Sequence, residues 1–348
     1  MVEIKTIEDK KTWDDFVTSR PEANFLQSWD IITAHQEMGR GTVRRAIYKD
    51  SKIIGVYSGF VERAKKGTGL MIAGGPLFEV AQLQNRGKNQ VDQLQAVFQD
   101  MRNEAKRLGC DFVRFRPQWE DSPEIRKALA SLGAQKAPFY LSVEHAGVLD
   151  ISGTEEEITA TFRQKARRAI RKAEKADLEL IASKNPDEID QFHKIELDHA
   201  KRQGYIPFSK KFLKTQFEVL AKNNEAELFI AKKDGEVLAE NFMVFYGNEA
   251  SYLYGVSTKK GMEYSAAPLL HLLAIREAKL RGITRYNFWG IVDEDDIKHR
   301  FYGVSVFKRG FGVQELKYVP AHDLVINPLR YYLLTKPIES LRRWRRKV

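Results

Sequence analysis

Cysteine is nearly absent from this sequence, which has one, Cys110, among 348 residues. A single cysteine excludes an internal disulfide. Cys110 begins an apolar stretch with no histidine close to it in the sequence, so we expect a buried, unreactive thiol. Long hydrophobic runs are absent too, since no stretch reaches about 18 consecutive apolar residues, and the chain opens on charges at Met1–Lys5 rather than on an apolar signal region. We therefore expect a cytoplasmic protein with neither a membrane span nor a secretion signal.

Several catalytic motifs are also missing. The sequence contains no Cys/His metal-ligand spacing, no His-Glu-x-x-His, no Gly-x-Ser-x-Gly and no Walker-type loop. Its seven histidines are scattered along the chain. These absences argue against metal catalysis and against a serine triad, and we expect no metal ion in the protein.

Acidic residues are outnumbered by basic ones. The 57 Lys and Arg residues exceed the 47 Asp and Glu residues, which gives a formal net charge of +10 and an isoelectric point near 9.4. Such an excess indicates a polyanionic partner, which could be a nucleic acid, an anionic lipid surface or a phosphorylated substrate. Charge alone does not choose among the three.

Two segments of the chain resemble each other. Glu104–Phe115 and Glu277–Phe288 both predict a helix that ends at glycine and is followed at once by an apolar-aromatic strand. Upstream of each lies a hairpin signal, Lys49–Lys52 in the first copy and Lys233–Glu236 in the second. The chain therefore reads as a duplication.

The order within each copy is helices, a meander of antiparallel strands, a long helix, a strand and a shorter terminal section. This order predicts an α+β fold with mixed sheets, and it is that of the GNAT (acyl-CoA N-acyltransferase-like) fold. At 348 residues with 43% hydrophobic content, the chain can build two cores. We place the first GNAT-like domain at residues 1–149 and the second at residues 150–348, which includes the basic helix and the basic C-terminal tail.

A basic helix is predicted from Arg163 to Lys175, after a capping box at Thr154–Glu157. Its apolar residues recur at three- and four-residue spacing, so one face packs on the protein. The cations Arg163, Arg167, Arg171 and Lys175 repeat every four residues, with Arg168 beside them. Like charges at this spacing repel by roughly a few tenths of a kcal/mol per pair. A phosphate backbone outside the helix is favoured over a solvated basic face.

The segment Phe301–Gly312 has the composition of a site. It places Lys308 between Phe307 and a turn formed by Gly310, Phe311 and Gly312. The glycines allow close approach of a ligand to the backbone, the aromatic rings can stack, and the lysine can stabilise developing negative charge. The alternative is an ordinary strand, turn and strand with a solvated lysine.

The C-terminal segment Arg330–Lys347 combines aromatic and leucine residues with a basic end. Three interpretations remain open for it: a helix on an anionic membrane, a contact with RNA, or a terminal helix docked on its own domain.

Taken together, these segments resemble the Fem-type aminoacyltransferases, the FemA and FemX relatives that build peptidoglycan side bridges. The residues that carry the resemblance are spread over nearly the whole chain: Asn24–Trp29, Arg167–Lys175, Tyr252–Ser257, Tyr286–Ile291, Phe307–Gly312 and His322–Pro328. The family has two GNAT-like domains. Because Leu149–Leu228 leaves no room for the long coiled-coil insertion of some members, this chain is similar to the compact FemX form.

The resemblance implies transfer of an amino acid from the 3′ ester of an aminoacyl-tRNA to the stem-peptide amine of a UDP-linked or lipid-linked muramyl pentapeptide. Lys308 would stabilise the tetrahedral oxyanion, and Phe307 would lie against the tRNA end. The cations of the basic helix would contact tRNA phosphates. Since an ester is already activated, no cofactor and no covalent enzyme intermediate are expected.

The same resemblance implies a grip on the acceptor's diphosphate. Its nearest counterparts here are Arg202, Tyr205 and Tyr254, with His35 where many relatives carry a lysine. No general base is assigned, because Arg116-Pro117 stands where relatives often have an acid. Two alternatives remain: an acyl-CoA-dependent N-acyltransferase acting on a sugar or peptide amine, and a catalytically idle tRNA- or lipid-binding relative. The basic C-terminus adds the expectation of a peripheral contact with the inner face of the membrane.

Overall fold

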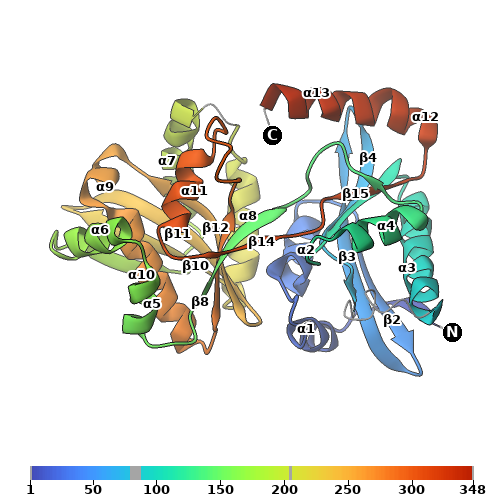
Figure 1. Cartoon of the computed structure of the whole chain (residues 1–348), viewed down its shortest axis with the longest axis horizontal. Helices are drawn as coiled ribbons and strands as arrows, with labels where there is room; N and C mark the ends of the chain where they lie inside the picture. The colour runs from blue at the N-terminus through green and yellow to red at the C-terminus, as the bar shows by residue number, and fades with distance from the viewer. Residues whose placement is uncertain (1, 79–87, 204–205, 347–348) are drawn as a thin grey trace. The chain divides into compact units, whose positions relative to one another are not determined.

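The structure, a computed structural model, describes residues 2–78, 88–203 and 206–346. It divides into two compact units, each a mixed sheet with helices on it (Figure 1). Unit 1 comprises Met1–Glu144 and Lys317–Val348, and unit 2 comprises His145–Leu316. The α+β class and the organisation in two units expected from the sequence are confirmed.

The strands of unit 1 are β1 (Glu3–Thr6), β2 (Thr42–Lys49), β3 (Lys52–Ala64), β4 (Gly67–Gly74), β5 (Leu77–Phe78), β6 (Phe112–Pro117), β7 (Gln135–Lys136) and β15 (His322–Val325). They pair in the order β1-β2-β3-β4-β6-β15-β7, with β5 on β3. Its helices are α1 (Lys10–Thr18), η1 (Phe25–Gln27), α2 (Trp29–Glu37), α3 (Lys88–Arg107), α4 (Pro123–Ser131), α12 (Pro328–Arg330), the π-helical η3 (Tyr331–Thr335) and α13 (Lys336–Arg346).

The strands of unit 2 are β8 (His145–Asp150), β9 (Glu179–Ser183), β10 (Ala226–Lys233), β11 (Glu236–Tyr246), β12 (Glu249–Ser257), β13 (Arg285–Gly290) and β14 (Gln314–Lys317). They pair in the order β14-β8-β13-β12-β11-β10-β9. Its helices are α5 (Glu155–Thr161), α6 (Gln164–Glu174), α7 (Glu188–Gln203), α8 (Lys210–Lys222), α9 (Lys259–Tyr264), α10 (Ala266–Leu280) and α11 (Tyr302–Arg309).

The structure divides the chain differently from the expected boundary after residue 149. Strand β8 pairs with β13 and so belongs to unit 2 from His145 onward. The expected second domain also included everything to residue 348, whereas residues 317–348 return to unit 1. The physical reason is long-range pairing, because β15 runs antiparallel to β6, with His322 opposite Phe115 and Val325 opposite Phe112. The basic tail is therefore part of unit 1.

The duplication is visible in both sheets. In unit 1 the antiparallel strands β2, β3 and β4 are followed by α3 and by β6, which pairs parallel to β4. In unit 2 the antiparallel strands β10, β11 and β12 are followed by α10 and by β13, which pairs parallel to β12. Both first hairpins turn through left-handed residues: Asp50 and Ser51 have φ of 49° and 63°, and Asp234 and Gly235 have φ of 51° and 78°. Such pairs match the twist of the flanking strands.

Strands β12 and β13 pair over only three residues. Glu249 to Ser251 lie opposite Arg285 to Asn287, and beyond them the two strands are no longer paired although both continue. A parallel pair that separates in this way leaves a gap in the hydrogen-bond ladder, where backbone groups of the two strands no longer pair with each other. This gap positions the site described below.

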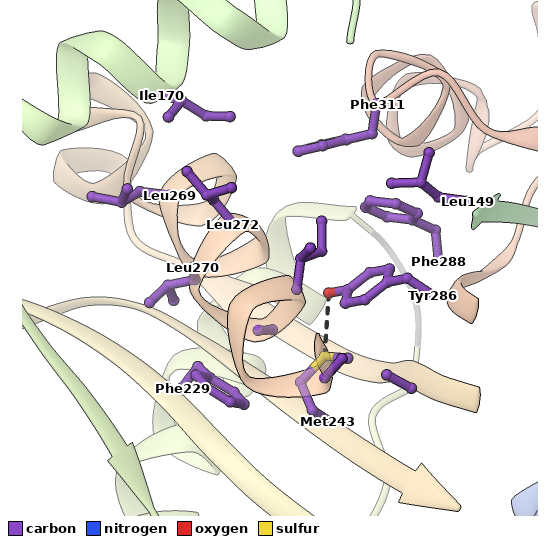
Figure 2. Packing of buried hydrophobic residues seen from close by; sticks show 14 of the residues in the cluster. Leu149, Ile170, Phe229, Met243, Leu269, Leu270, Leu272, Tyr286, Phe288 and Phe311 are labelled. Atoms are coloured by element: carbon purple, nitrogen blue, oxygen red, sulfur yellow. Dashed lines mark hydrogen bonds between the residues drawn. The ribbon is translucent and has the colours of Figure 1, made fainter. Parts of the chain in front are cut away.

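The core of unit 2 lies between its sheet and the helices α6 and α10. Figure 2 shows Ile170 of α6, Leu272 of α10 and Phe229 of β10 among the side chains of this cluster. Figure 2 also shows one polar contact inside it, the Tyr286 hydroxyl 3.4 Å from the Met243 sulfur. Helices α7 and α8 pack on the other face, against β12 and β10. Across the described part of the chain, no helix is both long enough and apolar enough to cross a membrane.

Candidate active site

Lys308 lies at the gap between the separating strands. Its Nζ atom donates a hydrogen bond of 2.8 Å to the carbonyl of Gly290, the last residue of β13. On the other side, Nζ lies 5.6 Å from the ring centre of Tyr252 on β12. The Gly290 carbonyl follows an irregularity of β13, because Trp289 has a φ of 66° and its N–H bonds to the Asn287 side chain at 2.8 Å. A positive φ at a tryptophan is uncommon and often accompanies a functional site.

The Lys308 amine is buried, with the whole side chain only 6% exposed. Burial lowers its pKa from 10.5 to about 7, because the charged form loses its hydration. Among the residues with described side chains, no carboxylate forms an ion pair with it that would oppose this shift. Such an amine exists in both protonation states near neutral pH and has charge available for a developing anion.

Two side chains fix α11 on either side of the lysine. The Ser305 hydroxyl donates to the Phe301 carbonyl at 2.9 Å and accepts from the Val292 N–H at 3.0 Å. The Arg309 guanidinium pairs with the Glu315 carboxylate at 2.6 Å and also donates to the Val292 carbonyl. The lysine is therefore held on a helix that is tied to Val292, at the start of the loop that follows β13. The sequence interpretation did not include these supports.

A cluster of packed rings, called here the aromatic wall, lies beside Lys308 and consists of Tyr252, His271, Phe307 and Phe311. His271 of α10 is fully buried, and its ring is 4.5 Å from Tyr252 and 5.5 Å from Phe307. Burial, and then the nearby lysine charge, lower the pKa of His271 to about 3, so the imidazole is neutral. Its Nδ1 atom lies 2.8 Å from the Tyr286 hydroxyl, while Nε2 has no hydrogen-bond partner among the described residues. Phe307 is half-buried and also packs 5.3 Å from Phe311.

A buried amide lies on the next strand. Asn241 of β11 is fully buried, and neither its side-chain oxygen nor its nitrogen has a partner in the described structure. It lies opposite Gly255 of β12. A Cβ atom at Gly255 would overlap the hydroxyl of Tyr252, so the absence of a side chain there makes room for this phenol. The part of β12 that has separated from β13 therefore carries the Tyr252 phenol. The Asn241 amide, which has no hydrogen-bond partner among the described residues, lies on the neighbouring strand β11.

Tyr254, expected at the acceptor's diphosphate, lies away from the lysine. The register between β11 and β12 shifts by one residue at Phe242, so that Tyr252 and Tyr254 turn to opposite faces of the sheet. Tyr254 contacts Phe242 and Phe208, at ring distances of 5.6 and 5.4 Å. Burial, and then the Glu196 carboxylate, raise its pKa well above the usual value for tyrosine, so its phenol stays neutral.

The other expected acceptor residues belong to different parts of the sequence. Arg202 lies in the last turn of α7, and Tyr205 lies outside the described residues. His35 belongs to unit 1, where its ring stacks on Phe60 at 3.6 Å and its Nδ1 atom is 3.1 Å from the Arg40 guanidinium. Burial, and then Arg40, lower the pKa of His35 to about 3. A neutral imidazole cannot supply the positive charge of the lysine it was expected to replace.

The basic helix is confirmed as α6, which begins at Gln164 after the N-cap residue Arg163. Its apolar stripe is buried against α10. Arg167 differs from the other cations, because it donates to the carbonyls of Ala160 and Phe162 at 3.0 and 2.6 Å and so closes the end of α5. The remaining cations of the expected tRNA contact are exposed: Arg163, Arg168, Arg171 and Lys175.

Among the described residues, no cluster of potential metal ligands is found. Within residues 2–78, 88–203 and 206–346, no three His, Cys, Asp or Glu residues lie close enough together to hold a metal ion. Cys110 is buried as expected, and burial raises the pKa of its thiol to about 11. The groups that the geometry brings together are an amine of lowered pKa, a neutral imidazole, a phenol and an amide, which suit polarising and orienting an acyl group.

The comparisons with known proteins identify the family and the fold of this chain. The model of the FemAB family matches residues 9–218 and 209–336. The chain belongs to the FemAB family. One relative in this family is a Lipid II:glycine glycyltransferase of Staphylococcus epidermidis, 28% identical over 115 residues that make up 33% of this chain and 28% of the relative. Another is the aminoacyltransferase FemB of the same species, 31% identical over 106 residues, 30% of this chain and 25% of the relative.

The matches therefore span less than a third of the length of these curated relatives. Among solved structures, the crystal structure of FemX has a TM-score of 0.83 at 17% identity, covering 96% of this chain and 100% of FemX. A tandem GNAT protein from the clavulanic acid biosynthesis pathway has a TM-score of 0.59 at 12% identity, covering 94% of this chain and 99% of that protein. Both likenesses show the fold that the duplicated sequence predicted.

Proposed function

We propose that this FemAB family member transfers an amino acid from an aminoacyl-tRNA to the stem-peptide amine of a peptidoglycan precursor. The observation that carries the proposal is the buried amine of Lys308, with a pKa of about 7, in the gap between β12 and β13. Attack of an amine on an ester forms a tetrahedral intermediate with a negatively charged oxygen. A lysine in a desolvated setting stabilises that oxygen far better than a solvated one would.

The bonds balance without a cofactor. The acceptor nitrogen forms a bond to the carbonyl carbon, the bond from that carbon to the ribose 3′ oxygen breaks, and the oxygen leaves with a proton. In this proposal the protonated Lys308 donates a hydrogen bond to the oxyanion, and its contact with the Gly290 carbonyl holds the amine in place beforehand. The Tyr252 phenol and the Asn241 amide are the further polar groups of this region.

The negative charge of the phosphates of an aminoacyl-tRNA is complementary to the basic helix α6. Its exposed cations, Arg163, Arg168, Arg171 and Lys175, offer contacts to a phosphate backbone. Arg167 supports the helix from inside, so its role is indirect. Phe307 is half-buried and packs on His271 and Phe311, and we propose that its remaining surface contacts the terminal nucleotide.

The acceptor is a muramyl pentapeptide that is either nucleotide-linked or lipid-linked. The name of the glycyltransferase relative specifies lipid II, which supports the lipid-linked form as the proposed acceptor of this chain. Arg202 and Tyr205 remain the proposed grip on the diphosphate. Tyr254 and His35 would contribute hydrogen bonds there rather than charge, since both are neutral at physiological pH.

An assay with purified protein tests the proposal. The protein is incubated with labelled aminoacyl-tRNA and with either UDP-linked muramyl pentapeptide or lipid II. Ribonuclease-sensitive transfer of the label to the peptide is expected. Absence of transfer with each of the aminoacyl-tRNAs would contradict it.

A second function has one observation in its favour, the likeness to a tandem GNAT protein at a TM-score of 0.59. In that case the same gap would receive an acyl-coenzyme A, and the product would be an N-acylated sugar or peptide. Transfer that requires acyl-coenzyme A and resists ribonuclease would establish this function instead.

A further inference from the structure

The C-terminal segment of unit 1 has an unusual distribution of polarity. Tyr331, Thr335 and Glu339 follow one another at four-residue spacing and are fully buried, although each carries a polar group. A surface helix ordinarily buries an apolar stripe and turns its polar side to water. Here the side that faces the protein is the polar one.

Specific contacts satisfy this buried polar side. The Glu339 carboxylate pairs with Arg114 at 2.6 Å and also with Lys66. The Tyr331 hydroxyl donates to Asp323 at 2.7 Å, and the Thr335 hydroxyl donates to the Lys66 carbonyl at 2.7 Å. Because each group is buried and has a partner, rotating the helix would leave charges unpaired away from water. The contacts therefore fix which side of α13 faces out.

The outward side is apolar. Pro337 and Leu341 each lie two residues from Glu339, on the opposite side of the helix, and Trp344 follows one turn later. Leu341 is 46% exposed and Trp344 is 76% exposed. Six of the sixteen exposed large hydrophobic residues of the described chain lie between positions 329 and 344: Leu329, Tyr332, Leu333, Leu334, Leu341 and Trp344. Figure 1 shows α12 and α13 in red at the end of the chain.

Cations flank this apolar side. Arg330, Lys336 and Arg342 are exposed. The one acid of the segment, Glu339, is buried and already neutralised by its two partners. The exposed surface of residues 329–344, called here the C-terminal face, thus combines leucines and a tryptophan with positive charge.

We propose that the C-terminal face docks on an anionic lipid surface. Leucine and tryptophan side chains gain free energy by entering the headgroup and acyl boundary, and lysine and arginine gain by approaching anionic headgroups. A nucleic-acid backbone would satisfy the cations but would leave the leucines in contact with charged phosphates, so it matches half of the surface. The inference rests on the proposed function in one respect, because docking brings the enzyme to a lipid-linked acceptor.

Flotation of the full-length protein with vesicles tests the inference. The vesicles are phosphatidylcholine alone and an equimolar mixture of phosphatidylcholine and phosphatidylglycerol. The protein should float with the mixture and much less with phosphatidylcholine alone. The double variant Leu341→Ser/Trp344→Ser should reduce the bound fraction by about tenfold. Both side chains are exposed, so the variant should fold normally. Leu280→Ser, which changes a leucine that is 84% exposed on α10, is the matched control and should bind like the unchanged protein.

Charge and apolar contact are separated by a further variant. Lys336→Gln/Arg342→Gln should weaken binding to the mixed vesicles while leaving the weak binding to phosphatidylcholine unchanged. Binding of the Leu341/Trp344 variant equal to that of the unchanged protein would overturn the proposal. So would a failure of the unchanged protein to float with either vesicle. Loss of tRNA binding in the same variant, without vesicle binding by the unchanged protein, would assign the face to RNA instead.

Activity distinguishes this inference from the proposed function. The Leu341/Trp344 variant should transfer normally to the UDP-linked acceptor in solution and poorly to a lipid-linked acceptor in mixed vesicles. If the unchanged protein transfers to neither acceptor, the proposed function fails while flotation still decides whether the C-terminal face binds lipid.

Discussion

Lys308 and Gly290 are joined by a hydrogen bond from the lysine Nζ atom to the glycine carbonyl, 2.8 Å long. The bond crosses from α11 to the end of β13, where β12 has already diverged. A neutral carbonyl is a weaker acceptor than an oxyanion. The amine is therefore positioned in advance, and its interaction strengthens when negative charge develops on a substrate oxygen, which is the condition for lowering a reaction barrier.

The first prediction removes this amine. Lys308→Ala should lower turnover by roughly 10²-fold or more, the scale of losing one oxyanion donor, with little change in acceptor binding. Single-turnover transfer and acceptor affinity are to be measured separately. Lys298→Ala, at an exposed lysine in the preceding loop, is the control and should keep full activity. Undiminished turnover in Lys308→Ala would exclude the catalytic role.

The second prediction concerns pH and stability. Burial lowers the pKa of Lys308 from 10.5 to about 7, so between these values the unfolded chain binds more protons than the folded protein. Stability contributed by this group therefore rises with pH across that window, by up to about 1.4 kcal/mol per pH unit, and is lowest below pH 7. Relative to Lys308→Met, the unchanged protein should gain unfolding free energy between pH 7 and pH 10. The unfolding free energies of the two proteins are measured by denaturant unfolding at several pH values. The same pH dependence for both proteins across this range would contradict a buried, uncharged amine.

The third prediction divides the cations of α6 into two kinds. Arg168→Glu/Arg171→Glu should weaken tRNA binding by roughly tenfold or more and reduce the salt dependence of binding, because exposed phosphate contacts are lost. Arg167→Ala should instead lower the unfolding free energy by about 1–3 kcal/mol, because the carbonyls of Ala160 and Phe162 lose their donor. Filter binding at several salt concentrations and denaturant unfolding measure the two effects.

A control for the third prediction lies in unit 1. Lys127→Glu reverses an exposed lysine on α4 and should leave the salt dependence unchanged. Equal loss of tRNA binding in this control would mean that net charge, and not α6, determines the affinity.

The fourth prediction concerns Asn241. A buried amide without hydrogen-bond partners lowers stability, so Asn241→Leu should raise the unfolding free energy by about 1 kcal/mol. If the amide contacts the substrate, the same variant should lose turnover. Stability and activity then move in opposite directions, which a purely structural residue would not produce. Normal turnover in a stabilised variant would remove Asn241 from the site.

Local signals predicted much of the fold. The hairpin turns at Asp50 and Asp234, the capping box at Thr154 and the helix-glycine-strand repeats all depend on neighbouring residues, and all appear in the structure. The two similar segments predicted the tandem arrangement, and the family resemblance agreed with it. Within the site, Lys308 was singled out from its neighbours, because glycine and aromatic residues on either side are visible in the sequence.

Other features depend on contacts that a sequence does not display. Gly310 and Gly312 suggested a turn between strands, whereas both follow helix α11, with Gly310 at its C-cap and Gly312 at a φ of 72° just beyond. A one-residue shift of register at Phe242 separates Tyr254 from Tyr252, and no alternation of residue types announces it. His271 lay among scattered histidines, and its spacing on α10 gave no sign of the buried aromatic wall.

Because the chain returns to unit 1 after unit 2, it determines the order in which the two units can be completed during synthesis on the ribosome. Unit 2 is continuous from His145 to Leu316, so it can fold as soon as that segment has emerged. In unit 1, β15 lies between β6 and β7, so this sheet stays open along β6 until residues 322–325 have been made. The later-encoded unit can therefore be completed first, and the sheet of the earlier one is closed only after it.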